Sequence, residues 1–250
     1  MIERDGAQPR VSFAELTKRF GDLVAVDRLS LDLAPGEIFA FLGLNGAGKT
    51  TTMKVLVGLL APSAGCVTVD GMDVARRPEE VKRVLGYVPD EPYLYEKLTA
   101  AEFLEFVGTL HRVPLRELPA RRDRVLETFG LTAVGNRLIE TYSHGMRQRL
   151  VYASVFLHEP KVLVVDEPTV GLDPQGMQLV KGEFRRLAAA GATVFLSTHV
   201  LPLAEAVAHR IGIIHRGRLL ACGSPQELIR SAPGCRTLEE AFLWLVSKAR

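Results

Sequence analysis

The spacing of hydrophobic residues changes twice along the chain and divides it into three stretches. From Val11 to Val88, short runs of β-branched and aromatic residues alternate with turn residues such as Pro35-Gly36, which is typical of strands. From Thr99 to about Phe156, apolar residues recur at helical spacing and β-branched clusters nearly vanish, which predicts a mainly helical insertion. After Lys161 strand and helix patterns alternate again, and this alternation predicts a mostly parallel sheet.

Within these stretches the individual elements are short. The nearly continuous apolar run IFAFL predicts a strand buried on both faces, and glycines and a helical pattern follow it at once. The runs that predict strands are 11–16, 29–33, 37–43, 65–69, 85–88, 161–166, 192–197, 210–217 and 218–223. The patterns that predict helices outside the insertion are 51–60, 175–189, a stretch after His199 and two closing segments.

Composition changes this picture little. Apolar residues make up 47% and charged residues 24%, as in ordinary soluble globular chains. A balance of 31 Lys+Arg against 29 Asp+Glu is too even for a protein whose main task is to neutralise nucleic-acid phosphates. Three cysteines without a CxxC pair indicate neither a disulfide framework nor a Cys-rich zinc site, which favours a reducing cytosol. We expect residues 1–9 to be a polar tail and not a signal peptide.

One loop carries a phosphate-binding pattern. Residues 43–50, GLNGAGKT, fit G-x-x-x-x-G-K-[ST] between the buried strand and a helix. Glycines let backbone N–H groups approach phosphate oxygens at a helix N-terminus, Lys49 supplies a charge for the β- and γ-phosphates, and the Thr50 hydroxyl is a hard ligand for Mg²⁺. Chance alone produces the bare pattern in roughly one chain of this length per hundred. The residues predicted to hold a nucleotide here are Gly43, Asn45, Gly46, Ala47, Gly48, Lys49, Thr50 and Thr51.

A second predicted strand ends in two acids, Asp166 and Glu167. The carboxyl end of a core strand is where a phosphate-loop protein needs a carboxylate for its Mg²⁺, so Asp166 is a predicted metal residue. Glu167 follows directly, points elsewhere and is predicted to be the general base toward a water in line with the γ-phosphate. Taken alone, this pair is explained equally well as an exposed acidic turn before Pro168.

A third motif makes the pattern specific. Residues 141–150, TYSHGMRQRL, place Ser143 23 residues before Asp166. In this order the motifs resemble the ATP-binding cassette (ABC) family, whose signature LSGGQ precedes a basic, glutamine-containing helix. The likeness extends over nearly the whole chain. It implies a P-loop NTPase core with a mostly parallel sheet, a small antiparallel β region and a helical insertion.

The resemblance also implies a division of the chain and further site residues. Residues 10–250 are expected to form one ABC ATPase domain, with a nucleotide-binding core (10–88 and 157–223), a helical subdomain (89–156) and C-terminal helices (224–250). By resemblance, Gly171-Leu172-Asp173 corresponds to the D-loop and His199 to a catalytic switch histidine, although a lone histidine is more often structural. Phe20 stands where an aromatic ring packs on adenine, and plain core packing explains it equally well. The histidines His111, His158, His209 and His215 are read as structural.

In the family, two cassettes pair head to tail and hold each ATP between the phosphate loop of one and the signature of the other. Ser143 and Gly145 are then expected to contact the partner's γ-phosphate from the start of a helix near Met146, and Asp173 to belong to the same site. The predicted partners are therefore a second cassette and ATP with Mg²⁺.

Several positions depart from the family pattern. The glutamine loop usually reads Val-Pro-Gln, whereas here it is Val88-Pro89-Asp90. Asp90 is able to reach Mg²⁺ directly or through water and is the third predicted metal residue beside Thr50 and Asp166, but it lacks the amide's donor and adds repulsion next to phosphates. Three further departures are His144 and Met146 in the signature and Val170 in the D-loop.

The resemblance implies an ATPase subunit on the cytoplasmic face of the cell membrane, bound to a separate permease that supplies the membrane spans. Residues 237–243 and the YSHGM signature are similar to cassettes of exporter-type permeases. Residues 92–95, PYLY, are the predicted surface for a permease helix, with local packing as the alternative. Arg121, Arg122 and Arg124 form either a solvated helix face or a contact for anionic lipid.

Two other classes of function remain open. A soluble ABC-type ATPase that acts on ribosomes or DNA usually joins two cassettes or carries a long coiled coil, and neither pattern occurs here, so no nucleic acid is expected. A nucleotide-binding module without hydrolysis fits the altered loops, but Glu167 and His199 argue against it.

Overall fold

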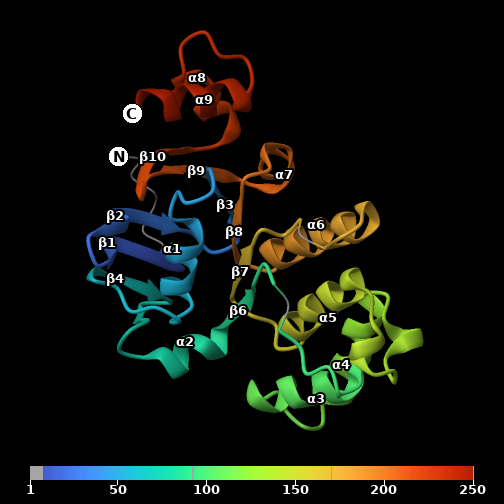
Figure 1. The fold of residues 1–250 in the computed structure, drawn as a ribbon. Coiled ribbons are helices and arrows are strands. Elements are labelled where there is room, and N and C mark those ends of the chain that lie inside the picture. Colours follow the sequence, from blue (N-terminus) through green and yellow to red (C-terminus); the bar gives the residue numbers. More distant parts are fainter. Residues whose placement is uncertain (1–7, 92, 170, 250) are drawn as a thin grey trace.

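The computed structural model describes residues 8–91, 93–169 and 171–249. The smaller sheet lies at the left in Figure 1, the strands of the larger sheet run through the middle, and helices α3 to α6 (within residues 100–189) lie to the right. The α/β fold with a mostly parallel sheet, a small antiparallel β region and a helical insertion is confirmed. Most of the predicted tail, residues 1–7, lies outside the described residues.

The smaller sheet is antiparallel, with strand order β2-β1-β4-β5. Its first two strands extend well beyond the predicted runs, because their outer halves carry charged residues that are exposed and break the apolar alternation. The short fourth strand was not predicted. The bounds are β1 (Val11–Phe20), β2 (Leu23–Leu33), β4 (Ala64–Val69) and β5 (Met72–Asp73).

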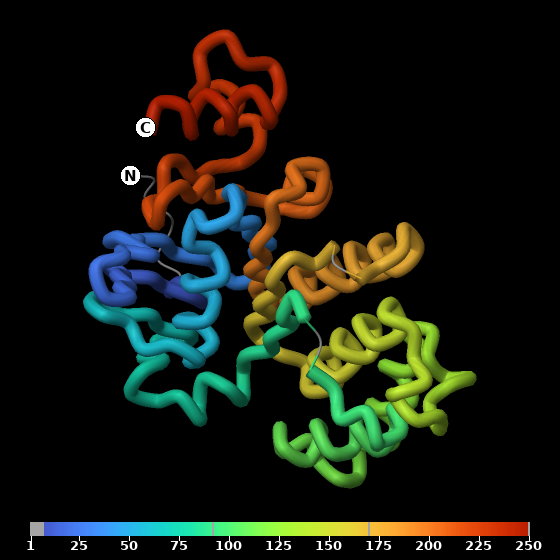
Figure 2. The backbone as a smooth tube through the Cα atoms, in the orientation of Figure 1, coloured from blue at the N-terminus to red at the C-terminus, as the bar shows by residue number. Residues whose placement is uncertain are grey.

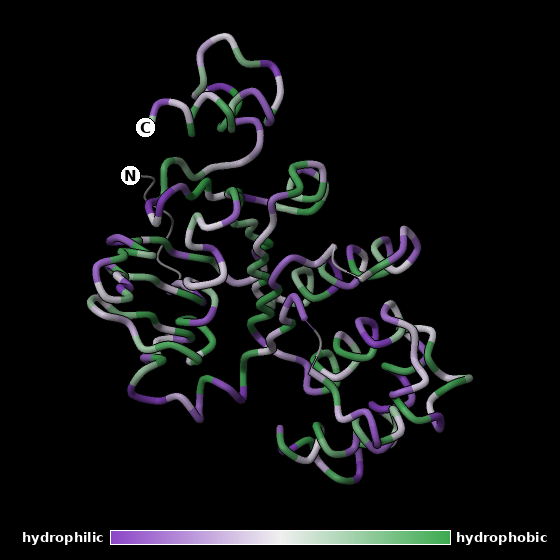
Figure 3. Tube along the Cα trace, in the orientation of Figure 1, coloured by the Kyte–Doolittle hydropathy of each residue, from purple (hydrophilic) through white to green (hydrophobic). Residues whose placement is uncertain are grey.

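The larger sheet has the order β10-β9-β3-β8-β7-β6 and is parallel except for its edge strand β10. Its inner strands β3, β7 and β8 are buried throughout and mostly hydrophobic (Figure 3), as expected of a sheet covered on both faces. Because β8 lies between β3 and β7, the carboxyl ends of these three strands meet at one edge. The bounds are β3 (Ile38–Leu42), β6 (Leu85–Val88), β7 (Val162–Asp166), β8 (Thr193–Thr198), β9 (Arg210–His215) and β10 (Arg218–Gly223).

Helix α1 (Lys49–Leu56) shares a core with both sheets. Its Met53 is fully buried in the same hydrophobic cluster as Phe13 of β1 and Phe195 of β8, whose ring centroids lie 5.9 Å apart. This packing fixes the phosphate loop, which precedes α1, against the sheet edge.

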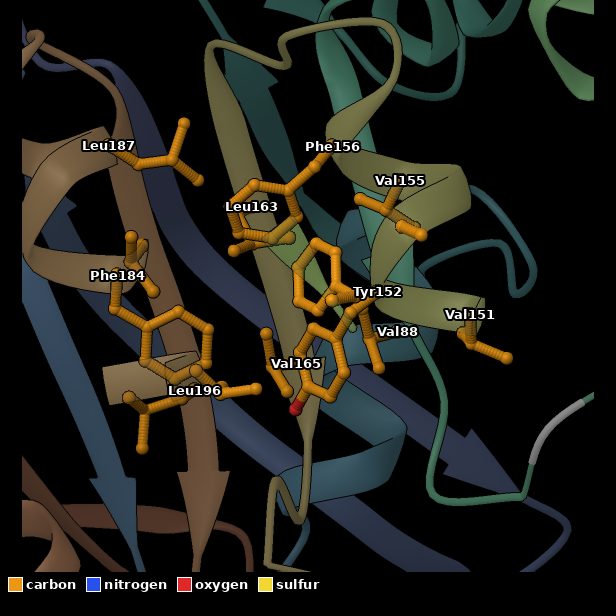
Figure 4. Close-up of a cluster of buried hydrophobic side chains, with 14 of the residues drawn as sticks. Val88, Val151, Tyr152, Val155, Phe156, Leu163, Val165, Phe184, Leu187 and Leu196 are labelled. Carbon is orange, nitrogen blue, oxygen red and sulfur yellow. The ribbon is translucent and has the colours of Figure 1, made fainter. Parts of the chain in front are cut away.

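The chain leaves the sheet after β6, passes through three helices and returns as β7 beside β6 (Figure 2). Tyr152 and Phe156 point from the third of these helices onto Leu163 of β7 and Phe184 (Figure 4), and these side chains are almost fully buried. The three helices are α3 (Ala100–Leu110), α4 (Leu118–Thr128) and α5 (His144–Phe156). The others are α2 (Pro78–Val84), α6 (Pro174–Ala189), α7 (Leu201–Val207), α8 (Pro225–Ser231) and α9 (Leu238–Lys248).

Some expectations were wrong in detail. The signature helix begins at His144 rather than near Met146, because Ser143 already caps it: its hydroxyl accepts a hydrogen bond from the Met146 N–H at 3.3 Å. Helix α1 ends at Leu56, four residues before the apolar pattern ends, and helix α2 was not predicted. Among the described residues no helix is both long and apolar enough to cross a bilayer.

A pair of histidines joins the helical stretch to the larger sheet. His111 follows α3 and His158 follows α5, and their rings stack with centroids 3.8 Å apart. The Nε2 atom of His158 lies 3.4 Å from the backbone oxygen of Leu85 in β6. Burial lowers the pKa of both rings, and the nearby His111 lowers the pKa of His158 further, to about 4. The pair is therefore held neutral, which supports a structural role for both histidines.

This pair should make the folded state acid-sensitive. The folded pKa of His158 lies below its ordinary value, so the unfolded chain binds the proton more tightly; stability is complete above pH 6.5 and is lost as the pH falls toward 4. The full loss is about 3 kcal/mol. Urea unfolding between pH 7 and 4.5 should show a weaker pH dependence for His158→Gln than for the natural chain. His215→Gln, outside the stack, should keep the natural slope, and equal slopes in all three proteins would contradict the prediction.

Candidate functional site

The phosphate loop wraps closely against neighbouring backbone, which explains two of its glycines. Gly46 and Gly48 adopt φ of +77° and +108°, a region that side chains disfavour. A Cβ at Gly48 would also lie 2.5 Å from the backbone oxygen of Ala25. Helix α1 begins directly after Gly48, so its first N–H groups face the loop.

Lys49 is buried and already bent back over this loop. Its Nζ donates to the backbone oxygens of Gly43 and Leu44, at 2.7 and 3.3 Å. The same nitrogen lies 3.5 Å from Oε1 of Glu167. The lysine charge thus stands between the loop and the end of β7, where the sequence analysis expected it.

Asp166 is buried at the end of β7 beside strand β8. One of its oxygens accepts a hydrogen bond from the Ser197 hydroxyl, while Oδ2 is buried without a hydrogen-bond partner. Burial raises the pKa of Asp166, the hydroxyls of Ser197 and Thr50 lower it, and the charges of Asp90 and Glu167 raise it again. A buried carboxylate next to other acids calls for a cation.

Glu167 lies between two basic side chains. One carboxylate oxygen faces Lys49, and the other lies 2.9 Å from Nδ1 of His199. Its backbone N–H donates to the backbone oxygen and to the hydroxyl oxygen of Ser197, at 3.2 Å each, and its φ is +48°. The structure therefore brings Lys49, Glu167 and His199 together, as the sequence analysis expected.

Lys49 and Glu167 line an open cleft of about 720 Å³, whereas Gly43, Asp166 and His199 are not among its lining residues. Phe20 lines it with a side chain that is 47% exposed, so plain core packing of this ring is wrong, whereas adenine stacking stays a prediction. Asp90 is also at the cleft, exposed, and close enough to affect the pKa of Asp166. The predicted residues that line the cleft are Phe20, Asn45, Gly46, Ala47, Gly48, Lys49, Thr50, Thr51, Asp90 and Glu167.

The signature residues lie elsewhere. Neither Ser143 nor Gly145 lines the cleft; both sit at the start of α5, where the ring of His144 lies against Gly171. Asp173 caps α6, and its Oδ1 accepts a hydrogen bond from the Gly176 N–H at 2.6 Å. Val170, the remaining departure from the family pattern, lies outside the described residues.

Sequence reasoning missed one wall of the cleft. The turn between β9 and β10 contributes Arg216 and Gly217, and the Gly217 N–H donates to the backbone oxygen of Ala47 at 2.9 Å. The start of β2 adds a second stretch, Leu23 to Ala25. No local motif marks either segment, because only the pairing of distant strands brings them to the loop.

Comparison with known proteins agrees with this geometry. Residues 26–170 match the family model described as ABC transporter. The chain is 42% identical over 219 residues to the daunorubicin resistance ATP-binding protein DrrA3 of Streptomyces coeruleorubidus, covering 88% of this chain and 69% of that protein. It is 38% identical over 229 residues to the Nod factor export ATP-binding protein I of Paraburkholderia xenovorans (strain LB400), covering 92% and 75%.

A solved structure of an ATP-binding subunit of an ABC transporter superposes with a TM-score of 0.89 at 31% identity, over 94% of this chain and 98% of that one. The family model, the relatives and the solved structure all agree with the motifs found in the sequence and with the cleft that the residues of those motifs line. The chain therefore belongs to the ABC transporter family, as an ATP-binding subunit with the ATPase activity of that family.

Proposed function

We propose that this chain hydrolyses MgATP in the cleft beside the phosphate loop and thereby drives export through a separate permease. The position of Glu167 between Lys49 and His199 carries the catalytic part of the proposal. Glu167 takes the proton of the attacking water, His199 orients that carboxylate and reaches the γ-phosphate, and Lys49 holds the β- and γ-phosphates.

The residues present suit Mg²⁺. Asp166 offers the unpartnered, buried Oδ2, and Thr50 and Asp90 add a hydroxyl and a carboxylate nearby, all hard oxygen donors. No cluster of three or more His, Cys, Asp or Glu side chains fit to hold a metal occurs in the described part of the chain. The two carboxylates of Asp166 and Asp90 are enough for Mg²⁺, because this ion is usually held by one or two carboxylates together with phosphates and water. When bound, Mg²⁺ would neutralise charge on the phosphates.

The separation of signature and cleft supports pairing with a second cassette. Ser143 and Gly145 sit at the N-terminus of the 13-residue helix α5, away from the chain's own phosphate loop. In a two-fold pair each chain would offer this helix end to the other's γ-phosphate, and Asp173 would lie at the same interface.

An exposed apolar patch supports a permease contact. Tyr93 and Tyr95 are 82% and 60% exposed, and Phe106 and Leu110 of α3 are 42% and 64% exposed, with Phe106 in ring contact with Tyr95. The exposure of Tyr93 argues against local packing for that ring, whereas Tyr95 packs edge-on against Phe106, with ring centroids 5.4 Å apart. Pro92, the first residue of the predicted surface, lies outside the described residues. We propose that residues 89–156, which carry this patch, form a helical subdomain beside the core (10–88 and 157–223) and the C-terminal helices (224–250).

The names of the relatives, daunorubicin resistance and Nod factor export, favour export as the direction. We propose a location on the cytoplasmic face of the membrane, without nucleic-acid contacts.

The three arginines of α4 give no support to a lipid contact, because each lies near acidic side chains. Arg121 pairs with Glu117 and Glu159, Arg122 with Glu105 and Asp123, and Arg124 lies near Glu159.

Reconstitution in proteoliposomes with the permease from a neighbouring reading frame tests the proposal. ATP hydrolysis should rise severalfold over that of the chain alone and should vanish with EDTA. A Tyr93→Ser, Phe106→Ser double variant should keep the basal rate and lose the stimulation, whereas Leu243→Ser, at an exposed apolar position on α9, should lose neither. Recovery of ribosomes and no membrane protein in a pull-down would instead favour the soluble class of ABC ATPase.

A further inference from the structure

The turn between β9 and β10 places a positive charge in the nucleotide cleft that none of the motifs explains. Arg216 lines this cleft together with Phe20 and the phosphate loop. The turn is held firmly: the Gly217 N–H donates to Ala47 at 2.9 Å, and the Gly217 oxygen accepts from the Asp27 N–H at 2.8 Å. A Cβ built on Gly48 would lie 3.4 Å from the Gly217 Cα, so the turn touches the loop directly.

The other charged residues that line the cleft are Lys49, Asp90 and Glu167, one cation and two carboxylates. Lys49 faces Glu167, so the lysine charge has a partner within the protein. Arg216 is exposed and forms no ion pair or hydrogen bond with another residue in the described part of the chain. A nucleoside di- or triphosphate brings several negative charges, and an unpaired guanidinium at the wall of its cleft is suited to meet them.

The local backbone does not favour an arginine at this position. His215 pairs with Arg218 across the hairpin, which leaves a two-residue turn in which Arg216 and Gly217 have φ of +48° and +78°. Such turns favour Asn, Asp or Gly at the first position, because a longer side chain is strained there. Other charged residues, including Glu15 and Arg28, share this conformation, so the strain counts only together with the position in the cleft.

We propose that Arg216 is a further nucleotide-binding residue, which contacts the phosphates that ATP and ADP have in common. Its turn contacts the loop at Ala47 and Gly48, whereas the catalytic pair Glu167 and His199 stands at the end of β7 and β8. The inference rests on the assignment of the nucleotide to this cleft.

Calorimetric binding of ADP and of a non-hydrolysable ATP analogue tests the proposal. Arg216→Asn should raise the dissociation constant of both nucleotides about fivefold, as expected for an exposed ion pair, and less so at high salt. Because Asn suits the turn better, the same variant should raise the melting temperature. The matched control is Arg218→Asn, two residues away in the same hairpin, where the arginine pairs with Asp27; it should not change nucleotide affinity.

A purely structural role for Arg216 predicts unchanged affinity, and equal dissociation constants for the Arg216 and Arg218 variants would overturn the proposal. A loss confined to the ATP analogue would also overturn it, because that result places the contact at the γ-phosphate. Lys49→Ala distinguishes a wrong role for Arg216 from a wrong assignment of the nucleotide to this cleft. If Lys49→Ala abolishes nucleotide binding while Arg216→Asn does not weaken it, the cleft assignment stands and only the role of Arg216 fails.

Discussion

Lys49→Ala should raise the dissociation constant for ATP by a factor of at least about 30, because it removes the buried cation of the phosphate loop and leaves Glu167 without its lysine partner. Fluorescent nucleotide titration measures this directly. The backbone N–H groups of the loop remain, so weak residual binding at high nucleotide concentration is compatible with the prediction.

Lys54→Ala provides the matched control, because Lys54 is exposed in the last turn of the same helix. It should bind ATP like the natural chain. If Lys49→Ala also binds ATP with undiminished affinity, the assignment of the nucleotide to this loop is wrong, provided that both variants have natural melting temperatures.

Glu167→Gln should keep ATP affinity and lower the rate of phosphate release by a factor of about 10² to 10⁴, the usual contribution of a general base. The amide is isosteric and still able to hydrogen-bond to His199, but it cannot take a proton from water. If two cassettes close around ATP, the variant should accumulate as a nucleotide-dependent dimer, which light scattering on a sizing column detects.

Glu79→Gln, at a position with a largely exposed side chain on α2, should hydrolyse ATP at the natural rate and show no such accumulation. Undiminished phosphate release by Glu167→Gln would refute the base assignment. Loss of release together with loss of ATP binding would point to a structural fault rather than a catalytic one.

The parts of the site that sequence predicts are those in which local pattern and chemistry coincide. The phosphate loop is a contiguous motif between a buried strand and a helix, and Asp166 follows another buried strand; parallel pairing then brings both to one sheet edge. Arg216 could not be found this way. Its position depends on the hairpin of β9 and β10, which contacts the loop although it lies more than 160 residues away in the sequence. The spacing of hydrophobic residues does not predict such a contact.

The hydrophobic pattern also did not predict which apolar side chains are exposed to solvent. Phe106 and Leu110 continue a helical apolar pattern with Phe103, yet only Phe103 is buried, because α3 turns the other two toward Tyr95 and solvent. The position of Phe20 at the cleft likewise depends on a β-hairpin whose outer half is polar.

The contact between Lys49 and Glu167 has a consequence for the order of events. The Glu167 carboxylate is the counter-ion of the Lys49 ammonium group. An incoming triphosphate competes for the same ammonium group. Nucleotide entry would thus exchange one anion for another at Lys49 and free the Glu167 carboxylate for the general-base role that we propose for it.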